Sequence, residues 1–322
     1  MEINRETNHG GTEGAERREG ERASAGWLYA FWQFSRPHTI VGTSLSVLGL
    51  YLIVYGAAKE NIFYSLLPIL GSWIACLCGN VYIVGLNQLE DVAIDRINKP
   101  HLPLAAGAFS QRTARIIVAV TGCLALLLAW LMGPFLLGMV SVSLLIGTAY
   151  SLPPIRLKRF PFWAAVCIFS VRGAIVNLGL FLHFSWVMQI DRSIPTSVWA
   201  LTLFVLVFTF AIAIFKDIPD MEGDRQYQIT TLTIQFGQGA VFALARWVLS
   251  ACYLGMAAAV FWLPSVNPVF LVATHLLALG VMWWRSTKVD LQDKSAVVQF
   301  YQFIWKLFFL EYLIFPAACL LN

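Results

Sequence analysis

Nine apolar stretches dominate the sequence, and each is long enough to cross a lipid bilayer as a helix. A transmembrane helix needs about 20 mostly apolar residues, because it must span a hydrocarbon core about 30 Å thick. Hydrophobic residues make up 58% of the chain, above the roughly 45 to 50% of soluble domains. We therefore expect an all-α, multi-pass membrane protein with nine transmembrane helices, at residues 39–56, 64–86, 114–132, 134–149, 162–182, 197–215, 240–262, 268–284 and 299–320.

Residues 1–25 form a polar segment of different composition, rich in Glu, Arg and Gly. Such a segment contains too few apolar residues to form a core, so we expect a disordered tail followed by one transmembrane domain over residues 26–322. The tail contains six Glu, whereas organelle transit peptides avoid acidic residues. The sequence therefore favours a prokaryotic origin.

Lys and Arg residues gather in alternate loops, which sets the expected orientation in the membrane. They occur in the tail and after the second, fourth, sixth and eighth stretches, whereas the opposite loops carry only Lys59 and Arg192. Basic residues accumulate on the cytoplasmic side of membrane proteins. We therefore expect a cytoplasmic N-terminus and a C-terminus on the opposite side.

Two groups of acidic residues follow the second and sixth stretches, on the expected cytoplasmic side. Spacings of about four residues place the side chains of each group on one face of a helix. Mg²⁺ commonly binds one or two carboxylates together with substrate phosphates, so we expect two facing groups that bind Mg²⁺ and a diphosphate. Ordinary acidic residues at helix ends are the alternative, but they do not explain the same pattern in two equivalent loops. The groups are Asn87, Asp91 and Asp95, and Asp217, Asp220 and Asp224.

Basic residues accompany both acidic groups. Arg96 and Lys99 follow the first group, Lys216 and Arg225 flank the second, and the segment YSLPPIRLKR contains Arg156, Lys158 and Arg159. Ammonium and guanidinium groups bind polyphosphates, so these residues are candidates for binding a diphosphate. The orientation rule alone would also place Lys and Arg here. For Lys158 and Arg159 the sequence favours neither explanation over the other.

Five polar residues lie within the apolar stretches, where such side chains usually face the bundle interior and pair with another polar group. Asn177 suits a substrate contact and an interhelical hydrogen bond equally well. The six Cys residues lie in apolar stretches without the paired spacing of a zinc site, so we expect packing roles for them. The other four polar residues are Arg172, His275, Lys306 and Glu311.

The pattern NxxxDxxxD that begins at Asn87 and the pattern DxxxD that begins at Asp220 resemble the motifs of the intramembrane UbiA-type aromatic prenyltransferases. The resemblance extends from Trp27 to the C-terminus. Within that superfamily, NQLEDVAIDRINKPHLPLAAG, YSLPPIRLKRF and VRGAIVNLGLFLHF look like the homogentisate prenyltransferase branch, which serves tocopherol and plastoquinone synthesis.

This resemblance implies a UbiA-like bundle of nine helices around a central cavity, in which Mg²⁺ holds a prenyl diphosphate. It also implies that Arg36, Lys158 and Lys216 contact the diphosphate and that Asp217 assists in metal binding. The residues that the two motifs identify as metal-binding and catalytic are Asn87, Asp91, Asp95, Asp220 and Asp224.

The reaction that the resemblance implies is the prenylation of homogentisate. Mg²⁺ and basic side chains stabilise the departing diphosphate, the homogentisate ring attacks the allylic cation, and loss of CO₂ and a proton restores aromaticity. Phytyl diphosphate is the expected donor, although geranylgeranyl and solanesyl tails are equally apolar. The resemblance implies location in the plasma or thylakoid membrane of a photosynthetic prokaryote, and we expect no nucleic-acid partner.

Two other functions fit parts of the sequence. Chlorophyll synthase and menaquinone prenyltransferases share the plan of two acidic motifs but use another acceptor, and NQLEDVAIDRINKP favours the homogentisate branch over them. A transporter would also bury charged residues among its helices, but near the bilayer midplane and on broken helices. The strongest charged groups in this chain instead follow the helices at one membrane face.

Overall fold

A computed structural model of the protein describes residues 26–58, 66–227 and 229–322. Within these ranges, nine helical segments are long and apolar enough to cross a membrane, and the residues form no strand. The expected disordered tail, residues 1–25, lies outside the described residues. The prediction of an all-α, multi-pass membrane protein with nine transmembrane helices is confirmed.

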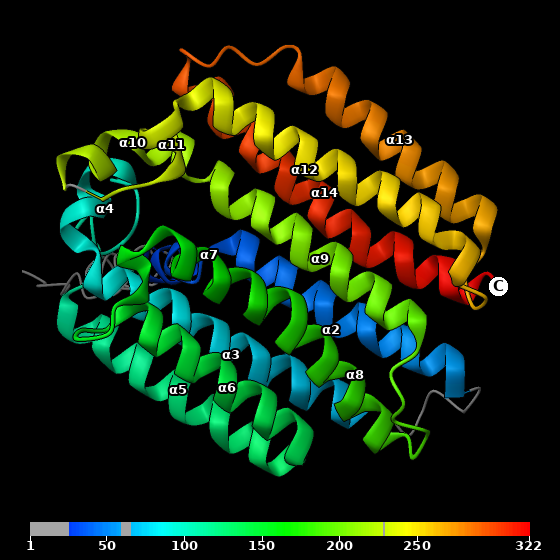
Figure 1. Ribbon diagram of the computed structural model, residues 1–322. Coiled ribbons are helices and arrows are strands. Elements are labelled where there is room, and N and C mark those ends of the chain that lie inside the picture. The colour runs from blue at the N-terminus through cyan, green and yellow to red at the C-terminus, as the bar shows by residue number, and fades with distance from the viewer. Residues whose placement is uncertain (1–25, 59–65, 228) are drawn as a thin grey trace, which may run out of the picture.

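The long helices run side by side, and three short helices gather at one end of the bundle while the C-terminus lies at the other end (Figure 1). The short helices are α4 (Val92–Asn98), α10 (Asp217–Gln226) and α11 (Leu232–Phe236). The long helices are α2 (Pro37–Ala58), α3 (Leu66–Glu90), α5 (Gln111–Met132), α6 (Pro134–Ser151), α7 (Pro161–Phe169) continued by α8 (Val176–Val187), α9 (Thr196–Phe215), α12 (Gln238–Ala259), α13 (Pro268–Ser286) and α14 (Lys294–Leu320).

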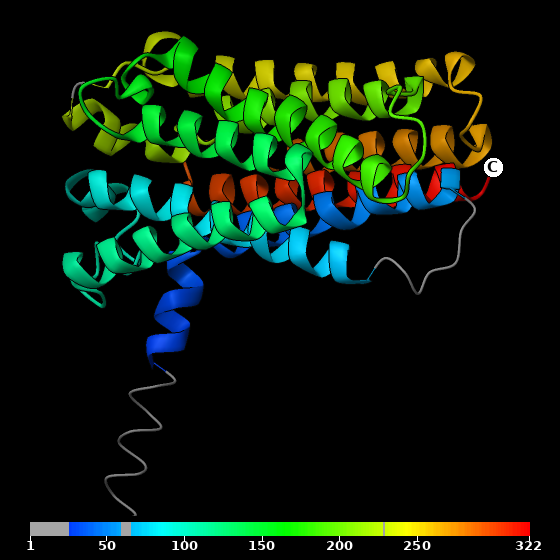
Figure 2. The same ribbon diagram turned by 90° about the horizontal axis from the view of Figure 1, so that it is seen from below.

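Residues 26–34 form a further helix, which leaves the bundle at a steep angle (Figure 2). Its side chains Trp27, Tyr29 and Trp32 are exposed. Tryptophan and tyrosine concentrate at the boundary between membrane and water. The composition of this helix therefore fits the membrane interface, and the helix ends just before Arg36, where the first transmembrane helix begins.

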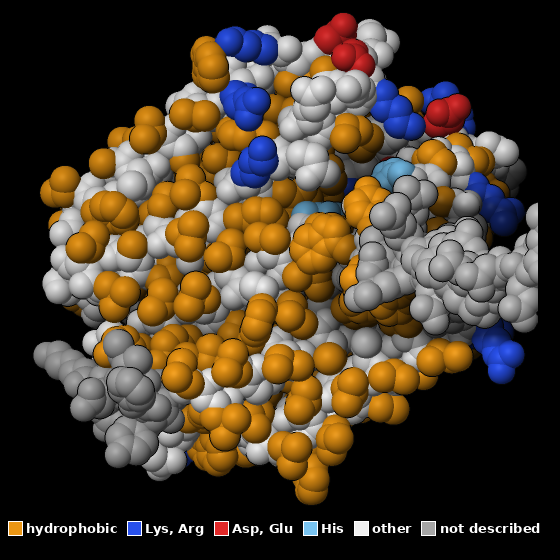
Figure 3. Space-filling view, turned by 180° about the vertical axis from the view of Figure 1, so that it is seen from behind, with side chains coloured by type: hydrophobic (Ala, Val, Ile, Leu, Met, Phe, Trp, Pro, Cys, Tyr) orange, Lys and Arg blue, Asp and Glu red, His pale blue; other side chains and the backbone are white. Residues whose placement is uncertain are grey.

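The outer surface of the bundle is apolar. Hydrophobic side chains cover most of the face shown in Figure 3, whereas most of its charged side chains lie toward the upper and right-hand edges. Large hydrophobic residues such as Leu145, Leu203 and Leu277 are exposed in the middle of their helices, with 63% to 69% of their surface accessible. Exposure of this extent is unfavourable in water, so lipid is the natural surrounding of these helices.

The third and fourth spans are separated by a sharp turn at Gly133 and Pro134. Gly133 has a φ of 132°, and a Cβ atom there would lie 2.4 Å from the ring of Trp186. Glycine is therefore required both by the backbone conformation and by the close contact. Pro134 starts α6, where its missing N–H leaves no helical hydrogen bond unmade. The expected separation between residues 114–132 and 134–149 is confirmed.

The fifth span contains a π-helical turn, η3 (Ser170–Ile175), between α7 and α8. Gly173 lies directly against α9, since a Cβ atom at this position would be 2.6 Å from the Cα of Leu206. A π-turn inserts an extra residue and changes the direction of nearby side chains. Arg172, which lies within this turn, lines the internal cavity.

Other polar residues within the membrane helices pair with one another. Asn177 accepts a hydrogen bond of 2.7 Å from the hydroxyl of Tyr312. Of the two roles that the sequence left open for Asn177, the structure shows the interhelical hydrogen bond. The buried His275 and Glu311 lie 3.1 Å apart and join α13 to α14. Lys306 is exposed on the surface of α14. The six Cys residues are free.

Candidate active site

The first acidic group lies across a break between two helices. Helix α3 ends at Glu90, and Asp91, with φ −113° and ψ 14°, precedes the first residue of α4. The prediction of a single helix face for Asn87, Asp91 and Asp95 is therefore wrong, because the backbone changes direction within the group. The N–H of Asp95 still donates to the carbonyl of Asp91 at 2.8 Å, and all three side chains line one cavity.

The second acidic group lies on a single short helix, as predicted. Helix α9 ends at Phe215, and α10 begins at Asp217. Asp217, Asp220 and Asp224 are spaced so that they share one face of α10. Asp220 and Asp224 are buried, with 9% and 7% of their surface exposed. All three residues line the same cavity as the first group.

Contacts between α4 and α10 join the two acidic groups. The ammonium of Lys99 forms an ion pair with Asp220. The side chain of Asn98 accepts a hydrogen bond of 2.9 Å from the N–H of Gly223 and donates one of 3.4 Å to Asp224. A Cβ atom at position 223 would lie 2.3 Å from Asn98 Oδ1. Glycine at this position therefore allows the close approach of the two helices.

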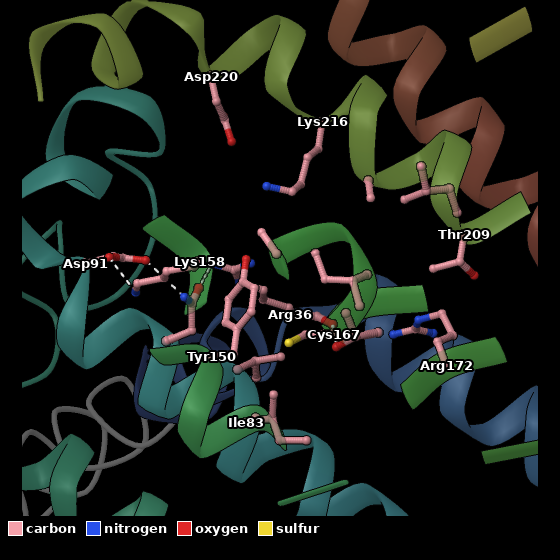
Figure 4. A pocket seen from close by; sticks show the side chains of 18 of the residues that line it. Arg36, Ile83, Asp91, Tyr150, Lys158, Cys167, Arg172, Thr209, Lys216 and Asp220 are labelled. Carbon is pink, nitrogen blue, oxygen red and sulfur yellow. Dashed lines mark hydrogen bonds and ion pairs between the residues drawn. The ribbon is translucent and has the colours of Figure 1, made fainter. Parts of the chain in front are cut away.

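Basic side chains from distant parts of the chain surround the first group. Lys158 Nζ lies 2.7 Å from Asp91 Oδ1, and Arg156 Nη2 lies 3.4 Å from the same oxygen. The amide of Asn87 donates to Asp91 Oδ2 at 2.9 Å, and Arg36 donates to Asn87 Oδ1 at 3.4 Å. Figure 4 shows Asp91 and Lys158 within this network. The turn after α6 and the start of α2 thus meet the end of α3.

Two of these arginines have unusual backbone conformations. Arg36 has a φ of 51° and Arg156 a φ of 40°, and among the described non-glycine residues only Gln189 also has a positive φ. This left-handed conformation costs about 1 kcal/mol or more for a side chain of this type, and it concentrates at functional sites. Contacts around the first acidic group therefore hold both arginines in this conformation, although non-glycine residues prefer negative φ values.

The cavity enclosed by these residues is large. Its volume of about 1700 Å³ exceeds the roughly 300 to 1,000 Å³ of ordinary small-molecule pockets, so it has room for a long apolar donor and an acceptor together. Eight Lys and Arg side chains and six Asp and Glu side chains line it. A surplus of positive charge in a confined site favours a polyanionic ligand. Figure 4 shows Asp91, Lys216 and Asp220 at one side of this space and Arg172 at the opposite side.

The predicted diphosphate-binding residues divide into two sets. Arg225 is exposed and does not line the cavity, and its guanidinium lies 4.0 Å from the sulfur of Met221. The structure thus separates Arg225 from the acidic groups. The other predicted residues all line the cavity: Arg36, Lys99, Lys158, Arg159 and Lys216.

The buried carboxyl groups have raised proton affinities. Burial raises the pKa of Asp224 to about 7, and the neighbouring charge of Asp220 acts in the same direction. Burial also raises the pKa of Asp95. Burial disfavours the charged form of a carboxyl group. A cation that enters the site and replaces the proton would therefore stabilise the ionised form of both carboxyl groups.

Two of the cavity lysines, Lys158 and Lys216, respond in opposite ways to their surroundings. The charge of Asp217, whose carboxylate lies 3.0 Å from the ammonium, raises the pKa of Lys216 well above its ordinary value. Burial lowers the pKa of Lys158, and the attraction of Asp91 opposes this effect. The side chain of Lys158 is also the less exposed of the two, at 11% against 36%, and a polyanion beside it would favour its charged form.

Comparison with known proteins identifies the family that this bundle and site represent. The model of the UbiA prenyltransferase family matches residues 26–307. The chain belongs to this family. Among its UbiA-family relatives, homogentisate phytyltransferase of Synechocystis sp. is 55% identical over 294 residues, which cover 90% of this chain and 96% of the relative. Homogentisate solanesyltransferase of Arabidopsis thaliana is 39% identical over 298 residues, covering 89% of this chain and 76% of the relative.

A solved UbiA structure has the same fold. The UbiA homolog from Archaeoglobus fulgidus bound to GPP and Mg²⁺ superposes with a TM-score of 0.61 and 16% identity, covering 89% of this chain and 99% of that one. At this level of identity the comparison concerns the arrangement of the helices. The multi-pass helical bundle inferred from the sequence is thus the UbiA fold.

The oxygen donors of the site fit Mg²⁺ bound together with a substrate. Among the described residues, no three His, Cys, Asp or Glu side chains converge closely enough to hold a metal by themselves. Asp91 and Asp220 are paired with lysines, whereas Asp95 Oδ2 is buried without a hydrogen-bond partner. Mg²⁺ is commonly held by one or two carboxylates plus phosphate oxygens. The donor set therefore suits an ion shared with a diphosphate.

The sequence does not single out Asn98, and it groups Arg156 with Lys158 and Arg159 without indicating the contact of Arg156 with Asp91. Asn98 precedes Lys99 near the end of α4, and only the nearby Pro100 marks a helix end there. Arg156 is one of three basic residues within four positions, and its left-handed backbone cannot be inferred from composition. Both residues act through contacts between segments far apart in the chain, which a local pattern does not reveal.

Proposed function

We propose that this protein is a Mg²⁺-dependent homogentisate prenyltransferase that uses phytyl diphosphate as its donor. The observation that carries the proposal is the convergence of both aspartate groups and five predicted basic residues on one cavity within a membrane bundle. The identity of 55% to a homogentisate phytyltransferase supports homogentisate as the acceptor and phytyl as the donor group. The solanesyltransferase relative, at 39% identity, makes solanesyl diphosphate the second donor to test.

The donor diphosphate binds at the end of the cavity formed by α4 and α10. When bound, Mg²⁺ neutralises charge on the diphosphate and makes it a better leaving group. Lys158 and Lys99 pair with Asp91 and Asp220, and both ammonium groups would be available to phosphate oxygens when these carboxylates hold a metal ion. The residues assigned to the metal are Asn87, Asp91, Asp95, Asp220 and Asp224, with Asp217 in an assisting role.

The basic side chains stabilise negative charge that develops as the allylic carbon–oxygen bond breaks. Arg36, Lys158 and Lys216 are placed around the diphosphate end of the cavity, where preorganised donors lower the barrier. The lining beyond them is apolar and includes Ile83, Val140 and Phe210. These apolar walls exclude water, which would otherwise capture the allylic cation.

The acceptor ring completes the reaction. A carbon of the electron-rich ring forms a bond to the allylic carbon, and the ring proton at that carbon is then lost, which restores aromaticity. The side chain of homogentisate loses CO₂, and the carbon that carried it takes up a proton. Proton loss from an alkylated ring is easy, so a weak base suffices.

We propose that the cavity end formed by α4 and α10 faces the cytoplasm. The excess of Lys and Arg in the loops at this end supports the orientation. The similarity to a protein of Synechocystis supports a photosynthetic prokaryote and its plasma or thylakoid membrane as the location. Labelling of single cysteines introduced at Arg225 and at Arg192 with a membrane-impermeant reagent tests the orientation, because only one of the two should react from the cytoplasmic side.

The decisive experiment supplies membranes that contain the protein with Mg²⁺, homogentisate, and either phytyl, geranylgeranyl or solanesyl diphosphate. We expect a decarboxylated, prenylated quinol whose mass corresponds to the phytyl group. Chelation of Mg²⁺ should abolish its formation. Absence of any product from homogentisate with all three donors would contradict the proposed function.

A further inference from the structure

Arg172 has no polar partner in the part of the chain that the structure describes, although it lies within a transmembrane segment. Its guanidinium makes neither a hydrogen bond nor an ion pair with the described residues. The residue lines the central cavity, and Figure 4 shows it on the opposite side from Asp91 and Asp220. An arginine at membrane depth is costly and normally marks a functional site. Its unmet N–H donors therefore need an anion that enters the cavity.

Two aromatic rings fix the orientation of this guanidinium. Its central carbon lies 5.2 Å from the ring centre of Trp305 and 5.6 Å from that of Phe308. Cation–π contacts of this kind stabilise the charge of the guanidinium, and they use none of its N–H groups as hydrogen-bond donors to an oxygen. On α2, a Cβ atom at Gly42 would lie 3.0 Å from Arg172 Nη1, so the glycine gives the guanidinium its space.

The backbone around Arg172 is also specialised. The residue belongs to the π-helical turn η3, and Gly173 presses this turn against Leu206 of α9. Such turns are rare and occur frequently at functional sites. The turn and the two rings thus hold a single positive charge at a defined position on the cavity wall.

Neutral polar groups on α2 and α3 also line this cavity, close to Gly42 in the sequence of α2. The amide of Asn80 donates to the hydroxyl of Thr39 at 2.9 Å, and Thr43 donates to Asn80 Oδ1 at 3.5 Å. All three line the cavity. They provide hydroxyl and amide groups suited to the phenolic oxygens of an aromatic ligand, whereas Arg172 suits a carboxylate.

A series of contacts links this position to the diphosphate end of the cavity. The ring of His38 lies 4.8 Å from the ring of Trp305, and Trp305 makes a cation–π contact with Arg172. His38 follows Arg36 by two residues, and Arg36 contacts the first acidic group. A ligand held by Arg172 would therefore lie beside the allylic end of a donor whose diphosphate is held at the acidic groups.

We infer that Arg172 binds the carboxylate of the aromatic acceptor and positions its ring for attack on the allylic carbon. This inference rests on the proposed function, in which the acceptor is homogentisate, an aromatic acid. The diphosphate has its own cations at the α4 and α10 end, so a separate cation across the cavity serves the second anionic substrate. Two charged recognition sites then keep the two substrates in a fixed relative orientation.

The test compares Arg172→Met and Arg172→Lys with Arg246→Met in the full-length protein. Arg246 is a matched control, because its guanidinium lies 4.9 Å from the rings of both Phe242 and Trp283 but does not line the cavity. We expect Arg172→Met to raise the KM for homogentisate about 10- to 100-fold, as charge-assisted hydrogen bonds are lost. Arg172→Lys should have a smaller effect, and Arg246→Met should leave this KM unchanged.

Two further measurements identify the ligand group. The KM for phytyl diphosphate should be unchanged in Arg172→Met. Inhibition by 2-methylhydroquinone, which keeps the ring and hydroxyls of homogentisate but lacks its carboxylate, should also be the same in the wild type and in Arg172→Met. A parallel rise in the KM for phytyl diphosphate would overturn the inference and assign Arg172 to the diphosphate. Equal losses in Arg172→Met and Arg246→Met would overturn it in favour of a packing role.

The inference and the proposed function fail in different ways. A wild-type protein that forms no product from homogentisate contradicts the proposed function. An active wild type with the same KM for homogentisate as Arg172→Met contradicts the inference alone. If Arg172→Met does not insert into membranes, Arg172→Gln replaces it, because this change removes the charge but keeps a polar side chain on the cavity wall. This variant should also raise the KM for homogentisate selectively, and an unchanged KM would overturn the inference.

Discussion

The two acidic groups present their carboxylates to the same cavity by different means. Asp91 lies at a break between α3 and α4 and is held by Lys158 and Arg156, which come from the turn after α6. Asp220 and Asp224 lie on the continuous helix α10 and are held by Asn98, the last residue of α4, and by Lys99, which directly follows it. Both groups therefore contact a lysine from another segment, but only the second also depends on hydrogen bonds between two packed helices, α4 and α10.

This difference predicts how each half of the site fails. Loss of a carboxylate should be equally severe in both groups if both hold Mg²⁺ and diphosphate. Disturbance of helix packing should affect mainly the second group, whereas loss of Lys158, which pairs with Asp91, should affect mainly donor binding at the first. The following substitutions test these expectations, from the largest effect to the smallest.

Asp91→Asn and Asp220→Asn should each lower kcat/KM by about 1,000-fold, because each removes a charged metal ligand and the electrostatic stabilisation that depends on it. Initial rates in membranes with saturating Mg²⁺ measure the effect. Glu222→Gln is the matched control, because Glu222 is an exposed residue of the same helix α10. Activity within a few-fold of the wild type in only one aspartate variant would show that the two groups are not equivalent.

Gly223→Ala should weaken Mg²⁺ binding about 10- to 100-fold, an effect typical of residues that orient metal ligands. The new methyl group would overlap Asn98, since a Cβ atom there lies 2.3 Å from its Oδ1. Asn98→Ala should have a smaller effect, because it removes hydrogen bonds without a clash. The double variant should be less impaired than the sum of the single effects, which a double-mutant cycle measures. Strict additivity would argue against the contact between α4 and α10 as the cause.

The helices could be predicted from the sequence, because length and apolar content determine a membrane span locally. The break at Asp91 and the π-turn at Arg172 could not, since they depend on contacts with distant segments such as Leu206. Arg225 illustrates the same limit within the site. It directly follows Asp224, yet adjacent residues on a helix point about 100° apart, so Arg225 is exposed while Asp224 faces the cavity.

The dependence of Mg²⁺ binding on pH should sharpen the description of the second group. The pKa of Asp224 is raised to about 7, so this carboxyl group is protonated below that pH and ionised above it. Mg²⁺ and the proton compete for the same oxygens. The apparent affinity for Mg²⁺ should therefore fall as pH decreases below 7, by up to about tenfold per unit, and should level off above pH 8. Asp224→Asn should bind Mg²⁺ more weakly and lose this dependence, whereas a flat profile in the wild type would contradict the raised pKa.

The smallest effects should separate basic residues that contact the donor from those that do not. Lys158→Met should raise the KM for phytyl diphosphate about tenfold, because it removes one charge-assisted contact from a partly desolvated site. Arg225→Met should change this KM less than about twofold, since an exposed charge outside the cavity is screened by water and salt. Both residues follow apolar helices on the same side of the membrane. The preference for basic residues on the cytoplasmic side therefore accounts for both positions and does not distinguish them. A larger rise in Arg225→Met than in Lys158→Met would mean that the diphosphate approaches the second acidic group from outside the cavity.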